Sequence, residues 1–488
     1  MTIRTENMPP GKRNPGRFPQ SVGLLIACIL ICFNGCGSYD GEKVRRDSDA
    51  EYRAASVETS KRELAQKEPL NLDDCIDIAL RNNYQVRRSE IEARIASLDR
   101  SVAFANFLPE VKLAGSAYTI DRQPMHFAGQ SPSGSPMYMP MQDQDVQTAS
   151  LRIQMPIFTP AAWFLYAARK RGEEIGQLVQ EFTRQTVMME VTAQYFNCLS
   201  LRDLTQAARS HVSAARQFRD DVEAMRARDL ASDLEVEEAR TRLLARETDL
   251  GRLERAERSA NIYLMGLMGL RPIRPCILED SADLKTPEGT LSELIAQAMF
   301  NHPLLKVADR NVEINRQMVK IAIADFLPSI VGFGDLAYTT DSFTKYSTSW
   351  TMGLSGVMTV FNGFANVNRY KIAREREKEA WLRREEACLT VILQILRAQT
   401  ILSDARADCA LARKNAELAS MRLSHAQQAW KEGLVSPTEL AGALAARDYA
   451  EEYRKITEHS LQISIATLRH AMGEPATDRS GKEDGNEK

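Results

Sequence analysis

The chain of 488 residues is long enough for two or three ordinary domains, and its 44% hydrophobic and 26% charged residues are the balance of a folded protein. Aromatic residues make up only 7%, which suits long helices better than β-sandwiches. A net charge of -2 provides no basic field, so the composition argues against nucleic-acid binding.

The N-terminus has the composition of an export signal. Four basic residues up to Arg17 precede an apolar run at 22–33, which at about 12 residues is too short to span a bilayer and fits a secretory signal core. Gly35 and Cys36 follow, and a Cys after a small residue at this place resembles a bacterial lipobox. We therefore expect a signal peptide at 1–35 and an acylated Cys36; the alternative is ordinary cleavage with Cys36 a passive residue.

Two polar segments flank the body of the chain. Residues 36–68 are charged and lack a sustained helical periodicity, so they are predicted to be a lipidated tether or an extended segment wrapping the body. Residues 474–488 are predicted to be disordered by composition.

The body is internally duplicated. Residues 72–109 recur without a gap as residues 291–328, each 219 positions later, and Phe107-Leu108-Pro109 returns as Phe326-Leu327-Pro328. This repeat is too long for a solenoid unit, so two halves of one architecture are the better interpretation, at 69–270 and 288–473.

After each Phe-Leu-Pro, apolar and polar residues alternate with a period of two, which is typical of a strand with one apolar and one polar face. The alternation is clearest at 151–157 and at 350–360. The sequence predicts β-hairpins at 110–158 and 329–361, with four strands in all.

The rest is predicted to be helix of unusual length. Residues 161–228 and 365–432 contain no Pro and carry apolar residues at helical spacing, so each helix would approach roughly 100 Å. Each then turns and returns as a second helix, which predicts long helical hairpins at 161–269 and 364–473.

These elements favour a shared membrane channel. Four tilted strands of about 10 residues can cross a bilayer but cannot close a barrel, and lipid does not tolerate unpaired strand edges. Three copies would give a closed barrel of twelve strands around an aqueous lumen, which the helical hairpins would continue as an α-barrel.

The duplication, the Phe-Leu-Pro junctions, Pro156-Ile157-Phe158 and the hairpin tips together resemble the TolC-like outer-membrane efflux channels over residues 72–473. The resemblance implies a homotrimer in the bacterial outer membrane that extends into the periplasm. It implies a passive exit duct for efflux or type I secretion that docks to a periplasmic adaptor and an inner-membrane pump, with no cofactor.

The same resemblance marks residues at the two hairpin tips. It implies that adaptor contacts are made by Leu230, Ser232, Leu434 and Ser436, for which turn formation and helix capping are the alternative role. It implies an acidic gate at Glu439 and Glu235, which could instead be ordinary acids at a helix N-terminus. Asp229 stands where the family has Gly.

The first copy holds an insertion of about 16 residues, and its Pro-, Gly- and Ser-rich segment 121–145 is predicted to be a loop. This segment contains five soft metal ligands suited to Cu(I) or Ag(I), namely Met125, His126, Met137, Met139 and Met141. The alternative is an external loop that packs over the barrel mouth.

No metal spacing occurs among the remaining cysteines, which are expected to be buried thiols unless export oxidises a pair. The chain has no metalloprotease spacing, phosphate loop or nucleophile elbow, so no enzyme is proposed. Two rival classes remain: a structural envelope coiled-coil protein or adhesin, and a periplasmic adaptor without channel activity.

Overall fold

The fold is that of a computed structural model, which describes residues 40–66, 69–272, 274–280, 283–432 and 434–477. The described chain forms two compact units that meet in the sequence at Lys61 and Arg62. The expected signal peptide and Cys36 lie outside the described residues.

The segment before the body is helical, so the prediction of no regular structure is wrong there. Helix α2 spans Gly41–Gln66. Asp40 Oδ1 accepts hydrogen bonds from the backbone N–H groups of Glu42 and Lys43, at 3.1 and 3.2 Å, and Arg46 pairs with Glu42 at 2.8 Å. Capping and local ion pairs favour this helix, and it has no apolar stripe. Its sequence therefore shows no apolar periodicity from which a helix could be predicted.

The duplication extends to the length of every helix in the body. Matching helices have 11, 22, 67 and 35 residues in both repeats. In the first repeat they are α3 (Leu72–Asn82), α4 (Tyr84–Ala105), α5 (Pro160–Arg226) and α6 (Asp233–Leu267). In the second they are α7 (Leu291–Asn301), α8 (Pro303–Ala324), α9 (Ala365–Lys431) and α10 (Pro437–Ala471).

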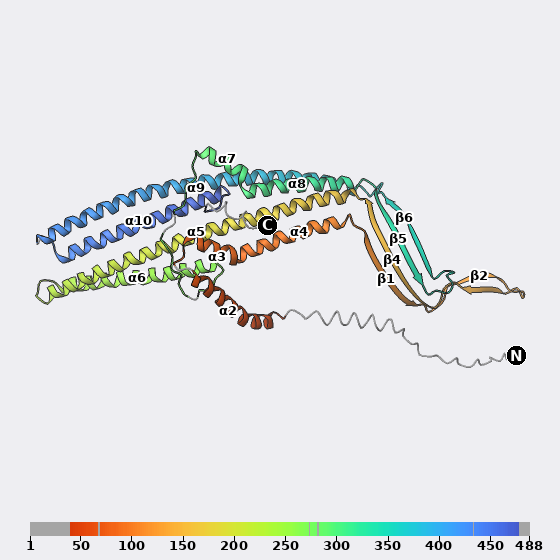
Figure 1. The fold of residues 1–488 in the computed structure, drawn as a ribbon, viewed down its shortest axis with the longest axis horizontal. Helices are drawn as coiled ribbons and strands as arrows, with labels where there is room; N and C mark the ends of the chain where they lie inside the picture. The colour runs from red at the N-terminus through yellow and green to blue at the C-terminus, as the bar shows by residue number, and fades with distance from the viewer. Residues whose placement is uncertain (1–39, 67–68, 273, 281–282, 433, 478–488) are drawn as a thin grey trace, which may run out of the picture. The chain divides into compact units, whose positions relative to one another are not determined.

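The two long helices form the frame on which the shorter ones pack. Helix α4 lies along one part of α5 and α6 along another, while α8 and α10 do the same for α9 (Figure 1). Helix α5 also packs against α8 and α10, which joins the repeats. Across the body the helices therefore follow the order α4, α5, α8, α9 on the strand side and α6, α5, α10, α9 toward the hairpin turns.

Glycines allow the return helices to end against the short helices. Gly269 follows α6 with φ 68°, and a Cβ there would lie 2.5 Å from Asn82 O. Gly473 follows α10 with φ 78°, and a Cβ there would lie 2.7 Å from His302 Cα. Only glycine combines this left-handed backbone with so close an approach.

The main core lies where α3, α7 and the linker between the repeats meet the long helices. Tyr195, Phe196, Ile395 and Leu468 are fully buried within it. Ala476 is also buried there, so the predicted disorder of the C-terminal tail is wrong for residues 474–477. Toward the turn of the first hairpin only small apolar clusters occur among the described residues.

The cysteines of the body are thiols in this structure. Cys75, Cys198, Cys388 and Cys409 are free, and Cys276 lies 3.1 Å from Asn261 Oδ1 as a hydrogen-bond donor. The expectation of mostly buried thiols is confirmed, because only Cys388 is partly exposed.

Four strands form one antiparallel sheet in the order β1-β4-β5-β6, as the alternation predicts. Their bounds are Glu110–Thr119, Asp145–Phe158, Ser329–Thr339 and Thr348–Val357. The predicted second hairpin extended too far, since residues 358–361 lie beyond β6.

The predicted loop in the first hairpin is also wrong in part. It contains a second hairpin made of β2 (Met125–Gln130) and β3 (Pro136–Pro140). The prolines of this segment made strands look unlikely, but within the two strands proline occurs only at the first and last positions of β3, where a lost N–H costs little.

Candidate functional site

The four-stranded sheet has one apolar and one polar face, set by its register. One rung across the strands is Leu113, Leu151, Leu336 and Trp350, and the next is Lys112, Arg152, Asp335 and Thr351. On the polar face Arg152 Nε pairs with Asp335 Oδ2 at 2.8 Å. A hollow on this polar face is lined by Arg152, Asp335 and Thr351 among others.

Both edges of this sheet are open. Among the described residues, β1 and β6 each pair with one strand only. Leu113 on β1 is 81% exposed and Trp350 on β6 is 71% exposed. An apolar face belongs in lipid, yet open edges there would leave backbone groups without hydrogen bonds. The sheet of one chain is therefore an incomplete membrane structure.

The turn of the first helical hairpin is built by a left-handed residue and a helix cap. Asp229 has φ 58°, and Leu230 N donates to Met225 O at 2.9 Å, which closes the end of α5. Ser232 then caps α6, since its Oγ accepts from Glu235 N at 3.2 Å. Leu230 is left 73% exposed at the turn.

The second turn repeats this arrangement. Leu434 N donates to Ala429 O at 2.8 Å, Ser436 Oγ accepts from Glu439 N at 3.1 Å, and Leu434 is 72% exposed. Near the turns the two hairpins also touch, because Thr438 at the start of α10 hydrogen-bonds to Asp221 on α5.

The two predicted gate acids are both held in helix caps. Glu235 Oε2 accepts from Ser232 N at 2.6 Å, and Glu439 Oε2 accepts from Ser436 N at 2.9 Å. The bond from Ser232 holds the pKa of Glu235 below its usual range. Both side chains are exposed, so their negative charge lies at the surface of the turns.

The soft ligands of the insertion are only partly gathered. His126 lies opposite Met139 in the β2–β3 register, and Met137 shares a face of β3 with Met139 by alternation. Met125 lies opposite Pro140 and so belongs to the other face, and Met141 follows the end of β3.

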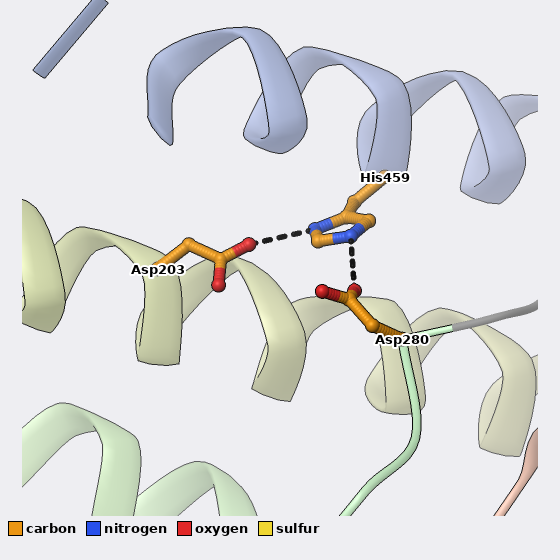
Figure 2. Close-up of side chains that lie close together, drawn as sticks. All are labelled: Asp203, Asp280 and His459. Carbon is orange, nitrogen blue, oxygen red and sulfur yellow. Dashed lines mark ion pairs between the residues drawn. The ribbon is translucent and has the colours of Figure 1, made fainter. Parts of the chain in front are cut away.

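One cluster was missed by the sequence analysis. Asp203 of α5, Asp280 of the linker and His459 of α10 lie together near the main core (Figure 2). These residues are far apart in the chain and share no recognisable spacing, so no sequence signal could have joined them.

The comparisons with known proteins agree with this geometry. The family model described as outer membrane efflux protein matches residues 75–270 and 294–474, one match for each repeat. The chain belongs to the outer membrane efflux protein family. No curated protein matches it in sequence.

Solved channels of similar structure share the fold of this outer membrane efflux protein. The Campylobacter jejuni CmeC outer membrane channel matches with a TM-score of 0.68 and 16% identity, over 82% of this chain and 85% of that chain. The outer membrane protein VceC of Vibrio cholerae matches with a TM-score of 0.65 and 17% identity, over 85% and 98%. The open-state MtrE outer membrane channel of Neisseria gonorrhoeae matches with a TM-score of 0.61 and 18% identity, over 83% and 89%.

The family establishes the role and the location. The protein is an efflux channel of the bacterial outer membrane that extends into the periplasm. Its amphipathic sheet is the part suited to lipid, and its helical body is the part suited to the periplasm.

Proposed function

We propose that three copies close their sheets into one barrel of twelve strands and form a passive exit duct of a tripartite efflux or type I secretion system. The observation that carries this proposal is the sheet with two open edges and an apolar outer face. Joining β6 of one copy to β1 of the next is antiparallel, as in the rest of the sheet, and removes every edge.

The edge helices of the body support the same assembly. Helix α4, at one side, carries an exposed stripe at helical spacing formed by Ile91, Ile95, Leu98 and Val102. Helix α9, at the other side, exposes Ile372, Leu382, Leu389, Leu393 and Leu396, and it includes a segment that is apolar enough for a membrane span by composition. Contact between α9 of one copy and α4 of the next would bury both stripes, which a monomer leaves in water.

The hairpin turns are the proposed docking site for a periplasmic adaptor and, through it, an inner-membrane pump. Leu230 and Leu434 are exposed apolar side chains in matching positions, as docking contacts require. Ser232 and Ser436 act through their caps by fixing the direction in which α6 and α10 leave the turns.

We also propose that Glu439 and Glu235 supply negative charge at the periplasmic entrance and so favour cations. Glu439→Gln tests this role cleanly, because a glutamine oxygen can keep the hydrogen bond from Ser436 N while the charge is lost. In planar bilayers the variant should show reduced cation over anion permeability with unchanged trimer stability. If the double variant Glu235→Gln/Glu439→Gln keeps the wild-type ion selectivity, the two acids serve only as helix caps.

Acylation of Cys36 would add a lipid anchor to the protein. Mass spectrometry of the mature protein distinguishes an acylated N-terminal cysteine from ordinary cleavage. Cys36→Ser should remove the lipid mass and leave the barrel itself membrane-inserted, because the sheet supplies its own apolar face.

The decisive experiment is the native mass of full-length protein extracted from outer membranes in mild detergent, combined with cysteine cross-linking of the edges. Lys112→Cys in β1 is paired in turn with Ser349→Cys, Thr351→Cys and Ser355→Cys in β6. We expect a trimer, and for at least one pair a covalent trimer under oxidising conditions.

The matched control is Ser150→Cys with Ala337→Cys, which lie opposite each other on β4 and β5 and can cross-link only within a chain. A detergent-independent monomer, with no intermolecular cross-link for any edge pair, would instead support an envelope coiled-coil protein without channel activity.

A further inference from the structure

Three potential metal ligands converge from three separate parts of the chain. One donor atom from each of Asp203, Asp280 and His459 lies within 4.8 Å of the other two. His459 Nε2 lies 3.5 Å from Asp280 Oδ1, and His459 Nδ1 lies 3.8 Å from Asp203 Oδ2. Figure 2 shows the imidazole ring between the two carboxylates.

The buried carboxylate is incompletely satisfied. Asp203 is 4% exposed, and among the described residues its Oδ2 has no hydrogen-bond partner although it faces His459 (Figure 2). Its other oxygen lies 3.3 Å from Arg202 Nη2, which also approaches Asp280 Oδ2 at 3.0 Å. Arg202 thus holds one oxygen of each carboxylate and leaves the other oxygen of each directed at the imidazole.

The other charged groups nearby are already paired. Lys455 Nζ lies 3.1 Å from Glu452, and Arg454 Nη1 lies 2.7 Å from Glu458. The two carboxylates with Arg202 leave one net negative charge beside a histidine, and of the two acids Asp203 is the buried one. A buried charge of this kind is costly unless a cation joins it.

We propose that Asp203, Asp280 and His459 bind a divalent transition-metal ion such as Zn²⁺, which ties the linker between the repeats to α5 and α10. Two carboxylate oxygens and one imidazole nitrogen are a donor set that zinc accepts, with water in the fourth position. Zinc with ligand bonds of about 2.1 Å keeps its donors roughly 3.4 Å apart, close to the 3.5 Å between His459 Nε2 and Asp280 Oδ1. Asp203 Oδ2 faces Nδ1 of the same ring at 3.8 Å, so its side chain would have to turn toward Nε2 to complete the site.

The protonation states suit this role. Burial lowers the pKa of His459, so the imidazole is neutral and can offer a lone pair near pH 7. Nε2 is the nitrogen available to the metal, because Nδ1 has Ser200 Oγ at 3.3 Å and Asp203 Oδ2 at 3.8 Å as polar neighbours.

The test uses full-length protein in detergent, stripped with a chelator and titrated with Zn²⁺ by calorimetry and with Co²⁺ by visible absorption. We expect one ion per chain, a tetrahedral Co²⁺ spectrum and a raised melting temperature. His459→Ala and Asp203→Asn should each weaken binding at least tenfold. The matched control is His425→Ala, which removes an exposed histidine of α9 and should leave binding unchanged.

Two results would overturn the proposal. One is equal metal binding by the wild type and His459→Ala, which would place the ion elsewhere. The other is no metal-dependent rise in melting temperature, together with a rise on acidification from pH 7 to 6 that His459→Ala abolishes. That pattern would show a protonated His459 joining the two carboxylates without a metal.

Discussion

The core at the inter-repeat linker and the four-stranded sheet differ in what covers their apolar side chains. In the core Tyr195, Phe196 and Ile395 are buried by residues of the same chain. In the sheet every residue of β1 and of β6 is exposed. The core can therefore form within one chain, whereas the sheet needs lipid and further strands to become stable. The following changes test this contrast, from the largest expected effect to the smallest.

The largest effect should come from Leu113→Arg on the apolar face of β1. A lipid-facing arginine costs about 2–4 kcal/mol near the bilayer midplane, and the proposed trimer would carry three. We expect loss of the membrane-inserted trimer, measured by outer-membrane fractionation and native mass, with the helical body still folded by circular dichroism.

Ser116→Arg is the matched control for that change, since Ser116 lies on the same strand but on the polar face. It should insert normally and change conductance only. Equal loss of insertion in both variants would contradict the assignment of the two faces.

Gly269→Ala should destabilise the core by about 2–4 kcal/mol, because it combines a left-handed backbone with a clash against Asn82 O. The control Gly266→Ala lies in α6 with open space around it and should be neutral or stabilising. Thermal unfolding in detergent measures both, and equal melting temperatures would show that the junction relaxes freely.

Acid should weaken the core through His302. Burial, with the charge of nearby His470, lowers the pKa of His302 to about 4, and its Nδ1 accepts a hydrogen bond from Leu304 N at 3.2 Å. Because the folded pKa lies below the unfolded value of about 6.5, its contribution to stability is complete above pH 6.5. As the pH falls from 6.5 to 4, about 3 kcal/mol is lost.

His302→Asn should reduce the loss of stability between pH 6.5 and 4. The change copies Asn83, the matching residue of the first repeat, whose Oδ1 caps α4 by accepting from Gln85 N at 2.7 Å. Melting temperatures between pH 7.5 and 4.5 measure the effect. A profile as steep as that of the wild type would assign the acid sensitivity to other groups.

The smallest effect should come from Asp229→Gly at the first hairpin turn. Asp229 has φ 58°, and glycine there avoids a cost of about 1 kcal/mol, offset in part by loss of the 2.9 Å pair with Arg226. We expect a slight rise in melting temperature with adaptor binding unchanged. A fall would show that the ion pair outweighs the backbone strain.

Much of the body could be predicted from the sequence because its signals are local. A constant spacing revealed the duplication, the absence of proline indicated the long helices, and alternation fixed which face of each strand is apolar. Helix α2 and the β2–β3 hairpin were missed, since caps, ion pairs and tolerated prolines leave no periodic apolar pattern.

Some residues of the candidate site could likewise be predicted from a local sequence pattern, and others could not. A glutamate follows three residues after both Ser232 and Ser436, which is the sequence pattern of a helix capping box. In the structure both glutamates accept hydrogen bonds within these caps. The cluster of Asp203, Asp280 and His459 has no sequence signature, because it depends on how α5, the linker and α10 pack.

The sequence by itself determined the duplicated plan, the amphipathic strands and the hairpin turns, since propensity, patterning and capping act over a few residues. Only the tertiary structure decided that β4 pairs with β5 across the two repeats, which leaves β1 and β6 as open edges. It also decided that α5 joins both hairpins and that a buried carboxylate faces a histidine 256 positions away. These features rest on contacts between distant residues, whose partners are chosen by packing and burial of the whole chain.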